Sequence, residues 1–209
     1  MSINSEKLIE FMKLAGGLKD IERFKGQFFW KDYPQQARYQ SVADHTWRMA
    51  LLLMLVEKDL SQPIDMAKAM KMAIVHDLAE VIAGDLSPLG TDGTGKDSHI
   101  YNAKAAEAKF ENELAAAKKM FGTLPQQLGE VMLGIWLEYE KQEAFEAKVV
   151  KAVDKIEGKL QAAEYAGGKM VDAHLDFSLK YGLVSYEADP ALKSLGLAVN
   201  EELKKDQGK

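Results

Sequence analysis

The chain has 209 residues, of which 47% are hydrophobic and 28% charged, a composition ordinary for a globular protein with one well-filled core. It contains no cysteine, which excludes disulfides, thiolate zinc sites, iron–sulfur clusters and cysteine nucleophiles. The formal net charge of -5 gives no broad basic field, so a nucleic-acid polymer is not an expected partner.

The amino-terminal segment MSINSEKLIE carries charges where a secretory signal needs an apolar run. No later segment reaches the uninterrupted apolar length that a membrane span requires. We therefore expect a cytoplasmic protein that does not contact a membrane.

Helical periodicity dominates the chain, and no alternating or β-branched run is long enough to predict a sheet. The sequence therefore predicts an all-α protein, a single-domain helical bundle over residues 1–209. The first helix is expected from the spacing of Leu8, Phe11, Met12, Ala15 and Leu18. Residues 23–39, which include Gly26, Pro34 and several aromatic side chains, predict an irregular connector that can cover a site.

The motif Ser41-x-x-Asp44 predicts a capping box, which places His45 in the first turn of a second helix. The apolar face of that helix is expected to consist of Trp47, Ala50, Leu51, Met54 and Leu55. A third helix is expected from near Pro63, a residue favoured at the first helical position, to near Gly84, a residue favoured just beyond a helix end.

The middle of the chain alternates between loop and helix signals. A flexible loop is expected over residues 87–98, followed by a helix over residues 101–120 and another that begins near Pro125. A long amphipathic helix comes next, with Asp154 beside an apolar stripe of Phe145, Val149, Ala152, Val153, Ile156, Leu160 and Ala163.

The last part of the chain carries no further motif. We take residues 8–168 as the motif-bearing core and residues 169–209 as a C-terminal helical extension, which ends in a solvated tail from Glu201 onward. In the helix that begins near Pro125, three residues are expected in the core rather than in an interface, namely Trp136, Leu137 and Tyr139.

Two histidines and two aspartates stand in an order that favours a metal site. His45 begins one predicted helix, the dyad His76-Asp77 lies on the next, and Asp154 lies on the long helix. Taken singly, each is more often a hydrogen-bonded or salt-bridged helix residue than a ligand. Together they suit a divalent ion such as Mn²⁺ or Co²⁺ and leave positions for water and a substrate oxygen. Because they come from three helices, the site requires those helices to converge in a bundle.

Two further acids follow the dyad. Glu80 lies three residues after Asp77 and four after His76, so it projects from the same helix surface. Its apolar neighbours disfavour full exposure, which favours a role at the metal or in catalysis over an ordinary exposed charge. Asp85 follows Gly84, where its carboxylate can face the metal or a bound water; the alternative is a simple turn residue.

The blocks SVADHTWRMA, AIVHDLAEVIAGDLSP and KVVKAVDKIEGKLQAAEY resemble the 5'-deoxynucleotidase-like branch of the HD-domain superfamily. The pattern of that branch, His, HDxxExxxGD, Asp, is met by His45, by residues 76–85 and by Asp154. The resemblance implies a helical HD-type fold and metal-dependent hydrolysis of nucleoside 5'-monophosphates, with deoxyribonucleotides preferred. It also implies a homodimer, and it leaves the metal open among Mn, Co, Mg and Zn.

The resemblance further implies which side chains contact the substrate. An arginine upstream of the first histidine orients the phosphate in this branch, and an aromatic residue follows it. Arg23 and Trp30 are the candidates here, with Arg38 as the alternative arginine. The other residues that match substrate-contacting positions are Asp77, Asp85, Leu86, Ser87 and Pro88.

The expected mechanism is in-line attack of a metal-activated water on phosphorus. Arg23 would neutralise charge on the phosphoryl oxygens. Glu80 or Asp85 would move protons, including the proton that the departing 5'-oxygen needs, and the sequence does not divide these roles. The candidate catalytic residues are therefore Glu80, Asp85 and Arg23.

Two alternative functions stay open at this point. One is a non-enzymatic or regulatory nucleotide-binding protein whose metal is only a structural clip. The other is a binuclear phosphodiesterase or oxygenase, which generally needs further histidines between the dyad and the last aspartate. Only His99 lies in that interval and His174 lies beyond it, so both are expected to be surface or structural residues.

Overall fold

The computed structural model describes residues 4–24, 39–90, 94–166, 170 and 172–206. Every regular element in these ranges is helical, and the one antiparallel bridge, between Glu22 and Ser41, belongs to no strand. The all-α prediction is confirmed. The α-helices are α1 (Ser5–Ala15), α2 (Val42–Val56), α3 (Met66–Val75), α4 (Glu80–Ala83), α5 (Ala103–Phe121), α6 (Gln126–Lys141), α7 (Phe145–Ala166), α8 (Asp172–Lys180), α9 (Leu183–Tyr186) and α10 (Pro190–Asp206).

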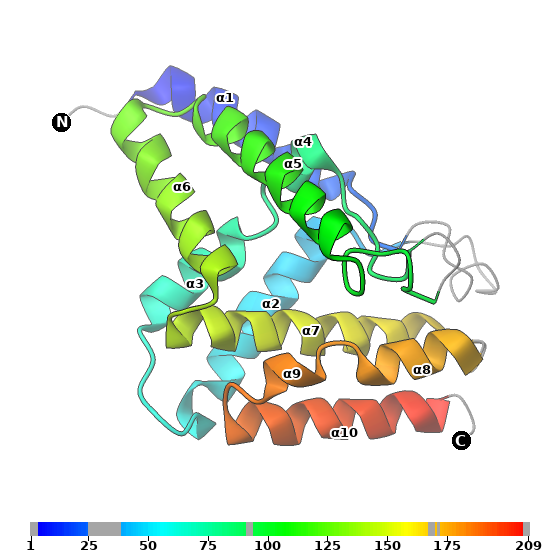
Figure 1. Ribbon diagram of the computed structural model, residues 1–209. Helices are drawn as coiled ribbons and strands as arrows, with labels where there is room; N and C mark the ends of the chain where they lie inside the picture. The colour runs from blue at the N-terminus through cyan, green and yellow to red at the C-terminus, as the bar shows by residue number, and fades with distance from the viewer. Residues whose placement is uncertain (1–3, 25–38, 91–93, 167–169, 171, 207–209) are drawn as a thin grey trace.

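Helix α7 lies at the centre of the bundle, packed against α2, α3, α6, α9 and α10 (Figure 1). Helices α1, α4, α5 and α6 lie on one side of it in Figure 1, and α8, α9 and α10 lie on the other. The predicted apolar stripe of α7 is buried, since Val149, Val153 and Ile156 are all fully inaccessible. Burial of this stripe on several sides fixes the direction in which the polar residues of α7 point.

Helix α2 begins with the predicted capping box. The Asp44 amide donates to Ser41 Oγ at 3.0 Å, and the Ser41 amide donates to Asp44 Oδ2 at 3.0 Å. This reciprocal pair satisfies two amides that a helix start leaves free, and it fixes where the first turn begins. His45 consequently lies in that first turn and is fully buried.

The predicted apolar face of α2 is not the side that packs into the core. Four of its large side chains are exposed, namely Trp47 at 57%, Leu51 at 44%, Met54 at 61% and Leu55 at 67%. The side that packs into the core instead carries Val42, Met49, Leu53 and Val56. Because residues 49–56 of α2 are apolar all round, periodicity alone does not tell the two sides apart.

The predicted third helix is two helices. The side chain of Asp65 caps α3 by accepting from the Lys68 amide at 3.0 Å, so α3 begins after Pro63. Residues 76–79 form a turn in which amides bond to carbonyls three residues back, as from Leu78 to Val75 at 3.1 Å. This tighter pattern breaks the α-helix at the histidine–aspartate dyad. Helix α4 then ends at the predicted glycine, Gly84, with φ 80°.

The predicted solvated tail from Glu201 is also wrong. Helix α10 continues to Asp206, and its Leu203 is fully buried in a cluster with Leu89 and Phe177. Leu192 and Leu203 recur on one side of the helix, so the last turns pack onto the bundle rather than fraying. The predicted core positions Trp136 and Tyr139 are buried at 1% and 2% exposure.

Within the described part of the chain, no helix combines the length and the apolar character needed to cross a lipid bilayer.

Candidate metal centre and its cavity

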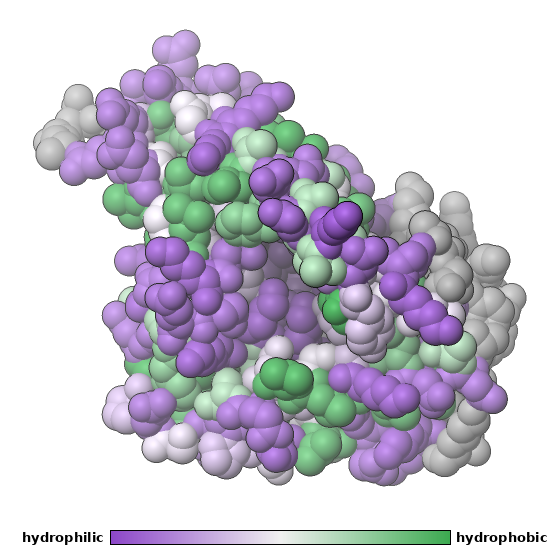
Figure 2. All heavy atoms as spheres, viewed as in Figure 1, coloured by the Kyte–Doolittle hydropathy of each residue, from purple (hydrophilic) through white to green (hydrophobic). Residues whose placement is uncertain are grey.

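A cavity of about 550 Å³ lies between α4 and α5 on one side and α7, α8 and α9 on the other. In the space-filling view it opens as a recess near the middle of the face shown, with hydrophilic side chains at its floor (Figure 2). The lining includes His76, Asp77 and Asp154. The cavity therefore joins the predicted metal donors to a space that can admit a small ligand.

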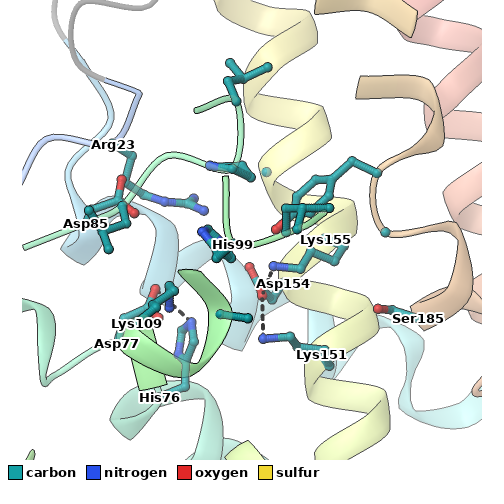
Figure 3. A pocket seen from close by; sticks show the side chains of 18 of the residues that line it. Arg23, His76, Asp77, Asp85, His99, Lys109, Lys151, Asp154, Lys155 and Ser185 are labelled. Carbon is teal, nitrogen blue, oxygen red and sulfur yellow. Dashed lines mark ion pairs between the residues drawn. The ribbon is translucent and has the colours of Figure 1, made fainter. Parts of the chain in front are cut away.

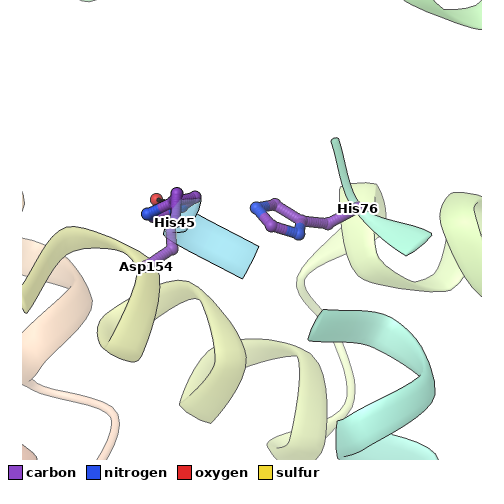
Figure 4. Close-up of side chains that lie close together, drawn as sticks. All are labelled: His45, His76 and Asp154. Atoms are coloured by element: carbon purple, nitrogen blue, oxygen red, sulfur yellow. Dashed lines mark ion pairs between the residues drawn. The ribbon is translucent and has the colours of Figure 1, made fainter. Parts of the chain in front are cut away.

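His45, His76 and Asp154 converge at this floor from α2, from the end of α3 and from α7 (Figure 4). One donor atom from each of the three lies within 4.8 Å of the others, and His45 Nε2 is 3.3 Å from Asp154 Oδ1. All three residues are buried. The group has the composition and the spacing that a divalent ion requires.

In each histidine, the ring nitrogen Nδ1 contacts a protein oxygen and so fixes the orientation of the ring. His76 Nδ1 lies 2.8 Å from the carbonyl oxygen of Ala73, and His45 Nδ1 contacts the carboxylate of Glu157. These acceptors favour the tautomer with the proton on Nδ1, which leaves a lone pair on Nε2. Both Nε2 atoms are buried and have no hydrogen-bond partner. A buried ring nitrogen without a hydrogen-bond partner lowers the stability of the fold unless it binds a cation. The residues present therefore fit a metal.

Asp77 lies beside this group. Its Oδ2 is 2.9 Å from His76 Nε2, in poor alignment for a hydrogen bond, and 3.9 Å from His45 Nε2. Burial acts to raise the pKa of Asp77, but the positive charges of His76 and His45 in their protonated forms lower it on balance. Asp77 is therefore an anion at the edge of the group.

Asp154 is held by three groups on its Oδ2 side. Lys155 Nζ is 2.9 Å away, Lys151 Nζ is 3.9 Å away, and the Tyr139 hydroxyl donates at 3.4 Å. Burial acts to raise the pKa of Asp154, but Lys155 and the other neighbours lower it well below its usual range. The carboxylate is thus ionised, with Oδ1 directed toward His45.

Glu157 is the residue that the sequence analysis missed. It is 1% exposed, and its carboxylate meets His45, the Gln40 amide at 2.8 Å, Arg23 Nη1 at 3.5 Å and Arg48 Nε at 3.3 Å. It lies three residues after Asp154, so the two acids project from one face of α7. This three-residue spacing from Asp154 is the sequence feature that could have identified Glu157 as part of the site.

Arg23 points into the cavity above the floor (Figure 3). Its Nη1 donates to Gln40 Oε1 at 2.9 Å, and the next residue, Phe24, has a left-handed φ of 56° that is rare for a bulky side chain. Burial acts to lower the pKa of Arg23, but Asp85 and Glu157 raise it on balance, so the guanidinium stays charged. Trp30 and the alternative arginine, Arg38, lie outside the described residues.

Glu80 and Asp85 both line the cavity. Glu80 is 7% exposed, and its Oε2 has no hydrogen-bond partner. Burial, with the charges of Asp77 and Asp85, raises the pKa of Glu80 well above its usual range. The pKa of Asp85 is also raised, by burial in the first place and against the pull of Arg23. The site therefore favours the protonated form of Glu80.

Two of the three loop residues after Asp85 reach the cavity, since Leu86 and Pro88 line it. Ser87 serves the loop itself, because its Oγ accepts from the Leu89 amide at 3.2 Å. Ser87 was predicted to contact the substrate, and the geometry does not favour that position for it.

Basic side chains also surround the floor, and none of them was predicted as a site residue from the sequence. Lys109, Lys151 and Lys155 line the cavity together with His99 (Figure 3). Burial and these three lysines lower the pKa of His99 to about 4, so its ring is neutral near pH 7. His99 was expected on the surface or in a structural role and instead faces the cavity, whereas His174 is a buried residue of α8.

The pattern of the HD domain family matches residues 18–195 of this chain. A 5'-deoxynucleotidase HDDC2 from Xenopus laevis is 37% identical over 160 residues, which cover 77% of this chain and 70% of that protein. The protein of the same name from Homo sapiens is 35% identical over 161 residues, which cover 77% of this chain and 69% of that protein. A helical fold that gathers two histidines and an aspartate at a buried floor agrees with this match, and the chain belongs to the HD domain family.

A solved structure supports the same fold. It is described as a predicted metal-dependent phosphohydrolase from Magnetospirillum magnetotacticum MS-1, and it aligns with a TM-score of 0.71 at 22% identity. The alignment covers 96% of this chain and 95% of that one. At this identity the likeness speaks for the fold, while the two curated relatives carry a named activity.

Proposed function

We propose that this protein is a metal-dependent 5'-nucleotidase that removes the phosphate from nucleoside 5'-monophosphates, with deoxyribonucleotides as the preferred class. The observation that carries the proposal is the pair of unpartnered Nε2 atoms of His45 and His76 beside Asp154, at the floor of a cavity that also holds Arg23. The relatives named 5'-deoxynucleotidase support the choice of substrate.

The metal would be held by His45, His76 and Asp154, with Asp77 as a fourth ligand. Two imidazole nitrogens favour Mn²⁺, Co²⁺ or Zn²⁺ over Mg²⁺, which prefers oxygen ligands. When bound, such an ion supplies an acidified water and polarises a phosphoryl oxygen. The two ionised aspartates balance its charge in the buried floor.

The remaining residues of the site have distinct tasks in this proposal. Arg23, held in place by Gln40 and Glu157, would bind the phosphoryl oxygens and neutralise charge as it develops. Glu80, protonated in the buried floor, would donate the proton that the departing 5'-oxygen needs. Asp85, whose pKa Arg23 influences, would take up the proton that the attacking water loses. Leu86, Pro88 and Trp30 stay proposed substrate contacts.

The test is phosphate release from a panel of deoxyribonucleoside and ribonucleoside 5'-monophosphates, measured with Mn²⁺, Co²⁺, Mg²⁺ and Zn²⁺ in parallel. We expect turnover with at least one transition metal and a loss of about a hundredfold or more in Asp154→Asn, because a ligand and its charge are removed. Asp59→Asn, an exposed aspartate of the turn after α2, serves as the control. Nucleotide binding without release by the metal-loaded protein would favour the regulatory alternative.

We also propose that the chain forms a homodimer. The support is the outer face of α2, where Trp47, Leu51, Met54 and Leu55 are 44% to 67% exposed. Contiguous apolar faces on a helix surface commonly mark protein–protein contacts. The cytoplasmic location expected from the sequence stays a prediction.

A further inference from the structure

The mouth of the cavity differs in character from its floor. Among the large apolar side chains that stay exposed, Tyr101 at 59% and Phe110 at 40% both line this cavity. The floor holds the candidate metal donors, Arg23 and lysines. A ligand that fits both parts has an anionic end and a flat apolar end.

The ring of Tyr101 is held in place from one side. Phe177 of α8 meets it at 6.2 Å between ring centroids with an interplanar angle of 88°. Phe177 is itself 6% exposed and stacks on Tyr181 at 5.3 Å and 19°. A perpendicular contact of this kind occupies at most one face of Tyr101, so a ring face of this exposed, cavity-lining residue stays available to a ligand.

A close backbone approach fixes Phe177 beneath the loop that carries Tyr101. Gly95 has φ 76°, and a Cβ at this position would collide with the Phe177 ring. The loop and α8 therefore meet at a point where only glycine fits.

The aromatic mouth is also linked to the floor. Lys155 Nζ lies 4.9 Å from the centroid of the Tyr181 ring and 2.9 Å from Asp154 Oδ2. The rings of Tyr181, Phe177 and Tyr101 then follow in contact. Because Phe177 and Lys155 already occupy Tyr181, Tyr101 is the member of this series that offers a ring face to a ligand.

We propose that Tyr101 is the platform on which the nucleobase of the substrate stacks, with Phe177 as its positioning residue. The proposal rests on the proposed nucleotidase function and adds how the base is held. Every base has a π-face, so a stacking platform holds purines and pyrimidines alike and prefers those with larger rings. The site would thus require a base without reading its hydrogen-bonding edge.

The test compares Tyr101→Ala, Tyr101→Phe and the unaltered full-length protein on two substrates, deoxyadenosine 5'-monophosphate and the base-free 2-deoxyribose 5-phosphate. We expect Tyr101→Ala to lower kcat/KM for the nucleotide by about 5- to 150-fold, mostly through KM, because a stacked base is lost. The base-free substrate should react equally well in both proteins, and Tyr101→Phe should restore the nucleotide rate. Leu197→Ala, an exposed apolar residue of α10, is the control.

A second measurement separates this inference from the proposed function. Equilibrium binding of deoxyadenosine needs no hydrolysis, and we expect Tyr101→Ala to weaken it by a similar factor. If the protein releases no phosphate but deoxyadenosine binding depends on Tyr101, the nucleotidase proposal fails and the platform stands. Equal losses on both substrates, or unchanged deoxyadenosine binding in Tyr101→Ala, would overturn the platform.

Discussion

Two ring nitrogens dominate the chemistry of this site. In both His45 and His76, Nδ1 contacts a protein acceptor, whereas Nε2 is buried without a hydrogen-bond partner. The sequence order of these histidines and Asp154 predicted the group. It did not predict Glu157, because the pairing of a carboxylate with a particular imidazole depends on how α2 packs against α7.

Glu157 gives the first prediction at this scale. Glu157→Gln keeps the shape of the side chain but removes the charge that holds the His45 Nδ1 proton. We expect metal affinity to fall by about 10- to 100-fold, as is typical for the partner of a metal-binding histidine. Competition titration of Mn²⁺ against a chelator measures this. Glu164→Gln, at an exposed acid of the same helix, is the control, and equal affinities in the two variants would contradict the assigned role.

Lys159 gives a prediction about pH. This buried residue of α7 donates to Asn200 Oδ1 at 2.8 Å, and burial lowers its pKa from 10.5 to about 8. Below pH 8 the lysine is charged in the folded and unfolded states, so its burial cost is fully present; above 10.5 it is neutral in both and the cost disappears.

The stability of Lys159→Met relative to the unaltered protein should therefore fall as the pH rises. We expect the difference in free energy of unfolding to shrink by about 2 kcal/mol between about pH 7 and 10. Urea denaturation at several pH values measures it. Lys71→Met, at an exposed lysine of α3, should show no such trend. A difference that stays constant for Lys159→Met would count against the buried charge.

At the scale of elements, the end of α4 leads the chain into Asp85, which lines the cavity. Gly84 ends α4 with φ 80° and ψ 156°, a conformation almost restricted to glycine, although a Cβ there would meet open space. We predict that Gly84→Ala destabilises the protein by about 1–3 kcal/mol through backbone strain alone.

A matched glycine provides the control for this prediction. Gly134, inside α6, also faces open space but has no positive φ. Gly134→Ala should stabilise the protein by about 0.5–1 kcal/mol, because alanine favours a helix interior. Urea denaturation of the two variants measures both effects. Changes of the same sign would contradict the strain argument.

Local signals predicted some elements well and others badly. The Ser41–Asp44 capping box and the apolar stripe of α7 are local patterns, and both elements formed as predicted. The break after Val75 was missed because its residues suit a continuous helix, whereas in the fold the His76 carbonyl accepts from the distant Trp136 indole at 3.0 Å. The predictions for the apolar face of α2 and for the last turns of α10 were wrong, because the burial of these residues depends on neighbouring helices.

At the scale of the whole molecule, the outer face of α2 predicts the state of assembly. If Trp47 and its apolar neighbours form a homodimer interface, Trp47→Glu should convert a dimer into a monomer, because it buries a charge in an apolar contact. Sedimentation velocity measures the mass of both proteins. Glu10→Gln, on α1, is the control, and a monomer in the unaltered protein would contradict the proposed assembly.

The convergence of α2, α3 and α7 on one cation is the central claim, and anomalous diffraction from a crystal soaked in Mn²⁺ tests it most directly. We expect one strong peak at bonding distance, about 2.0–2.3 Å, from His45 Nε2, His76 Nε2 and an oxygen of Asp154. A peak that no more than one of these residues touches, or a floor without any peak, would contradict it.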